Sequence, residues 1–203
     1  MRIGIDFDNT IAKYDGVFHR AAIECGLIPH DLPPSKNSVR DYLNGSGRKD
    51  DFTELQGYVY GSRMDLVSLY GGIAEFLAAA RSDGHELFVV SHKTRYPILG
   101  PRHDMHAAAQ SFLVAQGLIG AKGVPAESVF FCEGRDEKVA RINALGLSVF
   151  VDDLPEILTM PAFPASVRAL LFDPDGYHLE ARHTRPIERH DSWASIRAAL
   201  LGG

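Results

Sequence analysis

The chain has 203 residues, 45% of them hydrophobic, so it can bury one good core with room for a small second module, and a large multidomain machine is excluded. Its formal net charge of -5 gives no broad basic footprint, which argues against a protein that works mainly by coating nucleic acid polymers. No apolar run reaches the roughly 18 to 20 residues that span a bilayer, and no signal-like region precedes the first expected strand, so we expect a cytoplasmic protein without a membrane role.

The N-terminal stretch 2–11 has the composition of a buried strand that ends in two acids. Ile3 and Ile5 are β-branched, and Asp6 and Asp8 fall where such a strand leaves its sheet. Residues at i and i+2 share a face in extended structure, so both carboxylates can point into one site, where two anions need a cation between them. For the triplet alone a surface turn is the more common interpretation, because Asp and Asn favour turns.

The apolar periodicity then changes, and residues 14–72 are typical of an insertion made of short helices and loops. Helical spacing over 17–25 stops at Gly26, Ser35 can cap a second short helix, and a third begins near Phe52. Aromatic side chains are frequent here. They most simply form the small core of the insertion, although one or two could close over a substrate. They are Phe18, Tyr42, Phe52, Tyr58 and Tyr60.

Strands and helices alternate in the remainder of the chain. We expect strands at 86–91, 128–132, 147–151 and 167–172, and helices at 73–83, 103–118, 139–145 and after a cap at Ser192. This alternation predicts an α/β fold with a doubly wound parallel sheet, which binds ligands at the carboxyl ends of its strands.

Polar residues that recur at that edge of the expected sheet are the basis for a functional prediction. Each has a plain alternative by itself: a hydroxyl at a strand end, a solvated lysine on a helix, or a cap on the turn at 154–156. Together, in order and each correctly placed, they favour one site. They are Asp6 with Asp8, Ser91 after the second strand of the sheet, Lys138 at the start of the helix after the third, and Asp152 with Asp153 after the fourth.

These features resemble the four motifs of the haloacid dehalogenase-like (HAD) phosphohydrolase superfamily. The motifs match the segment 6–10, Ser91, Lys138 and the pair at 152–153. The resemblance implies a Rossmann-like catalytic core over 1–13 and 73–203, with the helical insertion 14–72 as a cap in the first insertion position. The ending around Asp191-Ser192-Trp193 is similar to the tail of 5'(3')-deoxyribonucleotidase-type members.

The resemblance also implies roles for the edge residues. Asp6 is the expected nucleophile that forms an aspartyl-phosphate, and Asp8 the general acid and later the base. Asp6, the backbone carbonyl of Asp8 and Asp152 are the expected ligands of Mg²⁺, with Asp153 as a further ligand or an orienting group. Ser91 and Lys138 would bind the phosphoryl group. Asn9 and Thr10 in the same loop are further candidates for phosphate binding, and Thr10 also for bracing the loop.

A basic segment follows Ser91, and it gives the candidates for substrate contact. His92, Lys93 and Arg95 are the nearest of its residues to the motif, and the alternative for all three is an ordinary solvated loop. His103 and His106 lie one helical turn apart, but two histidines without a clear third ligand make a poor metal site.

The leading hypothesis from the sequence is a Mg²⁺-dependent phosphatase for a small phosphorylated metabolite, either a nucleotide or a sugar phosphate. A 5'-nucleotidase-type specificity within the same chemistry is one alternative. A non-catalytic binding or regulatory module that keeps the fold is another, and the presence of every motif acid argues against it.

Overall fold

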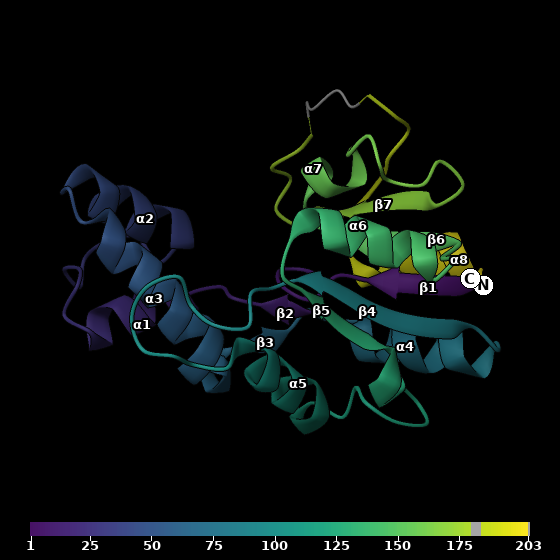
Figure 1. Cartoon of the computed structure of the whole chain (residues 1–203), viewed down its shortest axis with the longest axis horizontal. Helices are drawn as coiled ribbons and strands as arrows, with labels where there is room; N and C mark the ends of the chain where they lie inside the picture. Colours follow the sequence, from purple (N-terminus) through teal and green to yellow (C-terminus); the bar gives the residue numbers. More distant parts are fainter. Residues whose placement is uncertain (180–183, 203) are drawn as a thin grey trace. The chain divides into compact units, whose positions relative to one another are not determined.

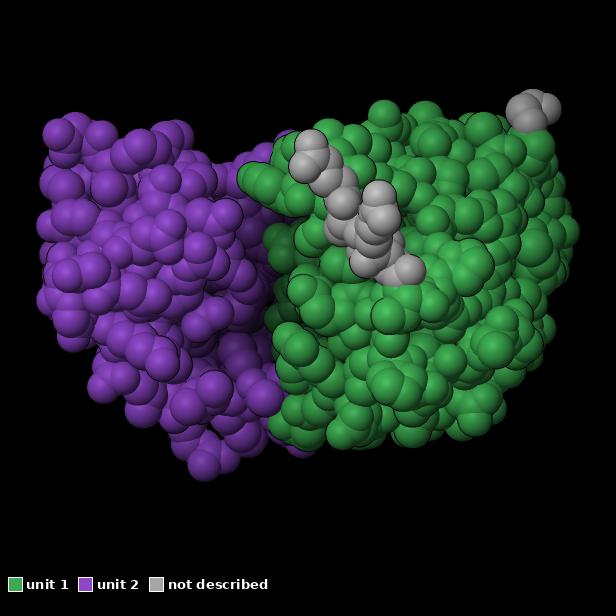
Figure 2. Space-filling view, turned by 90° about the horizontal axis from the view of Figure 1, so that it is seen from above, with its two compact units in different colours: residues 1–12, 69–93, 116–203 green, residues 13–68, 94–115 purple. Residues whose placement is uncertain are grey.

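A computed structural model of the chain describes residues 1–179 and 184–202 (Figure 1). Contacts between residues divide the chain into two compact units, which have different colours in Figure 2. Unit 1 comprises 1–12, 69–93 and 116–203, and unit 2 comprises 13–68 and 94–115. None of the helices in the described part of the chain is long and apolar enough to cross a membrane.

Unit 1 contains a parallel sheet of six strands in the order β5-β4-β1-β6-β7-β8. Its strands are β1 (Arg2–Ile5), β4 (Glu86–His92), β5 (Val129–Cys132), β6 (Val149–Asp152), β7 (Arg168–Phe172) and β8 (Glu188–His190). Its helices are α4 (Ile73–Ser82), α6 (Arg135–Ala144), α7 (Pro155–Leu158), α8 (Trp193–Leu201) and the 3₁₀ turn η2 (Ala126–Ser128). The predicted α/β fold with a doubly wound parallel sheet is confirmed. The strand β8 was not expected, because a run of three residues shows no pattern.

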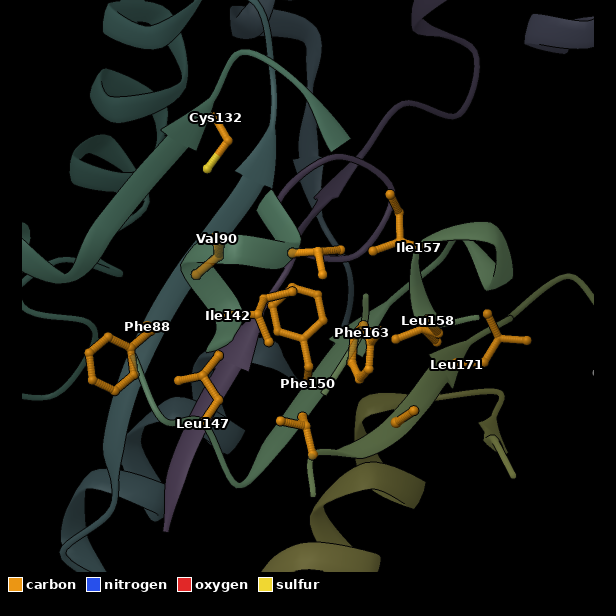
Figure 3. Packing of buried hydrophobic residues seen from close by; sticks show 13 residues of the cluster. Phe88, Val90, Cys132, Ile142, Leu147, Phe150, Ile157, Leu158, Phe163 and Leu171 are labelled. Carbon is orange, nitrogen blue, oxygen red and sulfur yellow. The ribbon is translucent and has the colours of Figure 1, made fainter. Parts of the chain in front are cut away.

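The strands β1, β4, β6 and β7 of unit 1 are buried on both faces. Phe88 and Val90 of β4 belong to a hydrophobic cluster beneath α6 and α7, drawn in Figure 3, whereas Leu87 and Val89 are equally buried but point to the opposite face. Successive side chains of a strand alternate between faces, so apolar residues at every position require helices on both sides. Figure 1 shows α6 and α7 over one face and α4 and α8 over the other.

β1 is the central strand, and its glycine allows close packing. Ile3 and Ile5 are fully buried. A Cβ atom on Gly4 would collide with the side chains of Leu147 and Phe150 from the neighbouring chain segment. The absence of a side chain at Gly4 therefore makes room for the Phe150 ring, which lies in the middle of the cluster in Figure 3.

Unit 2 is helical, with an aromatic core. Its elements are α1 (Val17–Glu24), α2 (Lys36–Gly45), α3 (Lys49–Ser62), η1 (Met64–Leu66) and α5 (Met105–Ala115). The ring of Phe18 lies 6.1 Å from that of Phe52 and 5.6 Å from that of Tyr60, which in turn contacts Tyr14. The short strands β2 (Ala12–Lys13) and β3 (Ser68–Leu69) pair with each other at the positions where the chain divides into its units.

The contacts group segment 94–115 with the inserted helices, whereas the sequence analysis placed it in the core range 73–203 and limited the insertion to 14–72. The reason lies on α3. A Cβ atom on Gly57 would collide with Pro97, and one on Gly61 would collide with His103, so two glycines four residues apart let this segment lie directly against the helix. The names catalytic core and cap for these units stay a prediction. Residues 180–183 and 203 of the predicted core range lie outside the described residues.

Trp193 connects the last helix to the loop after β1. Ser192 caps α8 as predicted, its Oγ accepting from the N–H of Ser195. The next side chain, Trp193, is fully buried, packs against Phe76 and donates from its indole N–H to the carbonyl of Thr10 at 3.0 Å. The C-terminal helix therefore stabilises the segment that carries the predicted nucleophile.

Replacing this tryptophan tests the connection. Trp193→Phe keeps an aromatic ring but leaves the buried carbonyl of Thr10 without its donor, so we expect the free energy of unfolding to fall by about 1–3 kcal/mol. Urea denaturation followed by circular dichroism measures this. Tyr177→Phe also removes a polar atom from an aromatic residue, but at a side chain that is 74% exposed, and it should change stability by less than about 0.5 kcal/mol. Equal stability of the two variants would contradict the assignment.

Candidate active site

The side chains predicted at the sheet edge follow three neighbouring strands of unit 1. β1 lies between β4 and β6, and Ile5 at its end pairs with Val151 of β6 and with Val89 of β4, two residues before Ser91. The N–H of Asp6 donates to the carbonyl of Val151 at 2.9 Å, which continues the pairing beyond the end of β1. Asp6, Ser91 and Asp152 therefore lie at one edge, and each is buried.

The loop after β1 is held by its own backbone. The N–H groups of Ile11 and Ala12 both donate to the carbonyl of Phe7, at 3.0 and 2.9 Å. Asn9 has a φ of 56°, a left-handed conformation that asparagine adopts more readily than most residues. This tight loop keeps the half-buried Asp8 next to the end of the strand.

Lys138 connects two of the carboxylates. Its Nζ lies 2.5 Å from Oδ1 of Asp6 and 2.6 Å from Oδ2 of Asp152, and all three side chains are buried. The lysine is in the first turn of α6, so the start of this helix places it at the edge of the sheet. Burial acts to lower the pKa of Lys138, but attraction to Asp152 and Asp6 outweighs burial, and the pKa lies above its usual value. The side chain is therefore an ammonium ion.

Asp6, Asp152 and Asp153 can each bring one carboxylate oxygen to within 4.8 Å of the others, an arrangement that suits a cation. Burial raises the pKa of Asp6 from 3.8 to about 7, although Lys138 opposes this. Burial, and after it the charge of Asp152, also raises the pKa of Asp153 well above its usual value. The three acids thus hold more negative charge than Lys138 balances. Their oxygen donors and their excess of charge fit Mg²⁺.

Asp152 also has the structural role that was considered as an alternative. Its Oδ1 accepts from the N–H of Leu154 at 3.0 Å, just before α7 begins at Pro155. The acid therefore stabilises the turn with one oxygen and binds Lys138 with the other. The two interpretations hold together.

Two hydroxyl groups at this edge are buried without a hydrogen-bond partner among the described residues. They are Oγ of Ser91 and Oγ1 of Thr10. A buried polar group without a partner is costly, so an unpaired hydroxyl in a site is a sign of a missing ligand. The side chain of Ser91, predicted to donate to a phosphoryl oxygen, is available for that contact.

Lys93 lies closer to the motif acids than the sequence analysis indicated. Its Nζ is 2.8 Å from Oδ2 and 3.1 Å from Oδ1 of Asp8, and its side chain is buried. The signal was present in the spacing: Lys93 follows Ser91 by two residues, as Asp8 follows Asp6, and residues at i and i+2 share a face. This spacing was not used in the sequence analysis, because the segment after Ser91 has the basic composition of a solvated loop.

The other two candidates for substrate contact are exposed. Arg95 belongs to unit 2, where its Nε donates to Oδ2 of Asp104 at 3.0 Å, close to the start of α5. His92 remains at the edge of unit 1. Burial of its ring lowers the pKa of His92, and the positive charges of Lys138 and Arg135 lower it further, so the imidazole is neutral at pH 7. Substrate contact by these residues stays a prediction.

Comparison with known proteins adds to this geometry. No protein-family model and no curated protein matches the chain. Solved structures do. A HAD family hydrolase from Deinococcus radiodurans R1, with bound phosphate and sodium, has a TM-score of 0.62 and 20% identity over 98% of this chain and 94% of that one. A HAD-superfamily hydrolase from Ehrlichia chaffeensis has a TM-score of 0.60 and 15% identity over 98% and 95%. A predicted phosphatase from Clostridium acetobutylicum has a TM-score of 0.60 and 14% identity over 98% and 97%.

The chain has the fold of the HAD-superfamily hydrolases. The resemblance inferred from the four motifs is thereby confirmed at the level of the fold. In this fold Asp6, Ser91, Lys138 and Asp152, one residue from each of the four motifs, are all buried. The likeness to deoxyribonucleotidases stays a prediction.

The excess of negative charge at this edge of the sheet predicts a dependence of stability on pH. The folded pKa of Asp6 lies above 3.8, so its contribution to stability is fully present below about pH 4 and is lost as the pH rises through about 7. Mg²⁺ relieves the repulsion but competes with protons. We therefore expect Mg²⁺ to raise the Tm of EDTA-treated protein more at about pH 8 than at about pH 6. Thermal unfolding followed by circular dichroism measures this, and equal shifts at both pH values would contradict it.

The unpaired hydroxyl of Ser91 predicts a separation of stability from binding. Ser91→Ala removes no hydrogen bond to the described residues, so the free energy of unfolding should stay within about 1 kcal/mol, whereas inhibition by inorganic phosphate should weaken roughly tenfold. Ser195→Ala is the contrast. Its Oγ bonds to Nδ1 of His190 at 2.8 Å, so this variant should lose stability and keep phosphate inhibition. The measurements are urea denaturation and inhibition kinetics, and the reverse pattern would be decisive against the role of Ser91.

Proposed function

We propose that the chain is a Mg²⁺-dependent phosphatase that hydrolyses a small phosphomonoester through an aspartyl-phosphate on Asp6. The observation that supports this most is the bridge made by Lys138, which contacts Asp6 and Asp152 while a carboxylate oxygen of Asp153 can lie within 4.8 Å of theirs. The site thus combines a carboxylate, a buried cation and further oxygen donors in unit 1. Unit 1 is then the catalytic core, and unit 2 is the cap.

The charges suit an anionic ester. A phosphomonoester carries nearly two negative charges, so a carboxylate can approach it only where positive charge cancels the repulsion. Lys138 supplies one such charge beside Asp6. When bound by the carboxylates of Asp6, Asp152 and Asp153 and the backbone carbonyl of Asp8, Mg²⁺ supplies two more and neutralises the phosphoryl oxygens.

The chain's own residues provide the remaining chemistry in two steps. In the first, an oxygen of Asp6 forms a bond to phosphorus, the ester P–O bond breaks, and the leaving oxygen takes a proton from Asp8. In the second, a water oxygen bonds to phosphorus, its proton passes to Asp8, and the bond to Asp6 breaks to release phosphate. Ser91 donates to a phosphoryl oxygen throughout, and Asn9 and Thr10 hold the loop around it.

The substrate class in this proposal is a small phosphorylated metabolite, a nucleotide or a sugar phosphate. The structure of the Deinococcus radiodurans hydrolase contains bound phosphate and sodium, which supports binding of an anion and of a cation by this fold. A 5'-nucleotidase-type specificity is the narrower alternative. A non-catalytic module is disfavoured, because a binding protein has no need for a nucleophile, its cation and a second acid in one place.

The nucleophile can be tested directly. Asp6→Asn keeps the shape of the side chain but removes the attacking charge, so turnover of p-nitrophenyl phosphate with Mg²⁺ should fall by a factor of about 10³ or more. Asp83→Asn makes the same change at an exposed position of unit 1 and should leave turnover unchanged. The assay without Mg²⁺ should show little turnover for either protein. Turnover that survives Asp6→Asn would refute the proposal.

A further inference from the structure

Lys93 is fixed at both ends. Its Nζ contacts both carboxylate oxygens of Asp8, at 2.8 and 3.1 Å, and its side chain is 3% exposed, against 20% for that of Asp8. Its backbone N–H donates to the carbonyl of Cys132 at 2.8 Å, which continues the pairing of β4 with β5. The Nζ also lies 5.6 Å from the centre of the Phe7 ring. A long, flexible side chain is thus held in one position by the sheet and by its neighbours.

The two buried lysines of the site contact different acids. Lys138 contacts Asp6 and Asp152, whereas Lys93 contacts Asp8. Lysine is rarely buried unless it is paired, and a buried pair must recover the loss of hydration of both groups. A carboxylate on the protein surface is hydrated by water and does not need a buried lysine beside it. The pairing therefore indicates that the orientation of Asp8 matters.

We propose that Lys93 is a positioning residue that holds the carboxylate of Asp8 in the orientation from which it accepts a proton from the attacking water. This inference rests on the proposed function and adds a residue to it. Between the two steps, after its proton has left with the leaving group and before water returns one, the mechanism requires Asp8 as a carboxylate. In that interval the ammonium of Lys93 keeps both oxygens of Asp8 in place.

The second step should therefore depend on Lys93 more than the first. p-Nitrophenolate leaves readily without a proton, so formation of the aspartyl-phosphate from p-nitrophenyl phosphate needs little help from Asp8. Its hydrolysis still needs a base that is correctly oriented. Loss of Lys93 should thus leave the enzyme trapped with phosphate on Asp6.

The experiment uses Lys93→Met, which keeps the length of the side chain and removes its charge. With Mg²⁺ and p-nitrophenyl phosphate, we expect the steady-state kcat to fall about tenfold or more, with a rapid release of about one equivalent of p-nitrophenol per enzyme beforehand. Intact-mass measurement after acid quenching should show the phosphorylated chain accumulating. Lys122→Met, the same change at an exposed lysine of unit 1, should behave as the wild type.

A second comparison tests the inference if Lys93→Met does not fold by itself. Asp8→Asn with Lys93→Met removes both charges together, and its phosphorylated form should decay at the same rate as that of Asp8→Asn alone, because Lys93 acts through Asp8. A further slowing in the double variant would overturn the inference. So would a Lys93→Met enzyme whose kcat falls without accumulation of the phosphorylated chain, or whose KM alone rises, as expected for a substrate contact. Failure of the proposed function is distinct, because the wild type itself would then form no phosphorylated chain.

Discussion

The structure of the site depends on the bridge between Lys138 and the carboxylates of Asp6 and Asp152. Each partner is buried, so none of the three charges is well hydrated, and each is tolerated because of the others. The strands β1 and β6 bring the two acids together, and the first turn of α6 brings the lysine. Any change that moves one of these elements leaves a buried charge without its partner. The geometry of the site and the stability of the sheet edge are therefore coupled.

The bridge leaves part of the negative charge of the three acids unbalanced, and the proposed function depends on this excess. A site selected for stability alone would pair each carboxylate or replace it by an apolar side chain. Here the pKa values of Asp6 and Asp153 are raised, so that in the absence of a cation a proton is the remaining means of relieving the repulsion. The same excess would attract the metal ion that the proposed function requires. The proposed active site thus lies where the sequence keeps unbalanced carboxylates that a protein selected for stability alone would not keep.

Much of this could be predicted from the sequence, because a parallel sheet brings the ends of its strands to one edge. Asp6, Ser91 and Asp152 are each the polar residue that ends a buried run, and topology alone makes them neighbours. The position of Lys138 followed from the start of the next helix. Patterns do not show which helix a segment packs against, so the grouping of 94–115 with unit 2 was missed. The glycines of α3 that permit this packing become informative only once their partners are known.

The pairing of Lys93 with Asp8 lies between these two cases. Its spacing follows the same rule of two as the acids, because Lys93 follows Ser91 by two residues as Asp8 follows Asp6, and β4 and β1 are parallel neighbours. In the proposed mechanism, each of these two strands contributes a residue that contacts the phosphoryl group and, two positions later, a residue that serves the proton transfer. Composition suggested a solvated basic loop, because a lysine after a strand is usually exposed. Composition predicts only the usual environment of a residue type, whereas the spacing along a strand predicts which way a side chain points. For Lys93 the spacing was the better predictor.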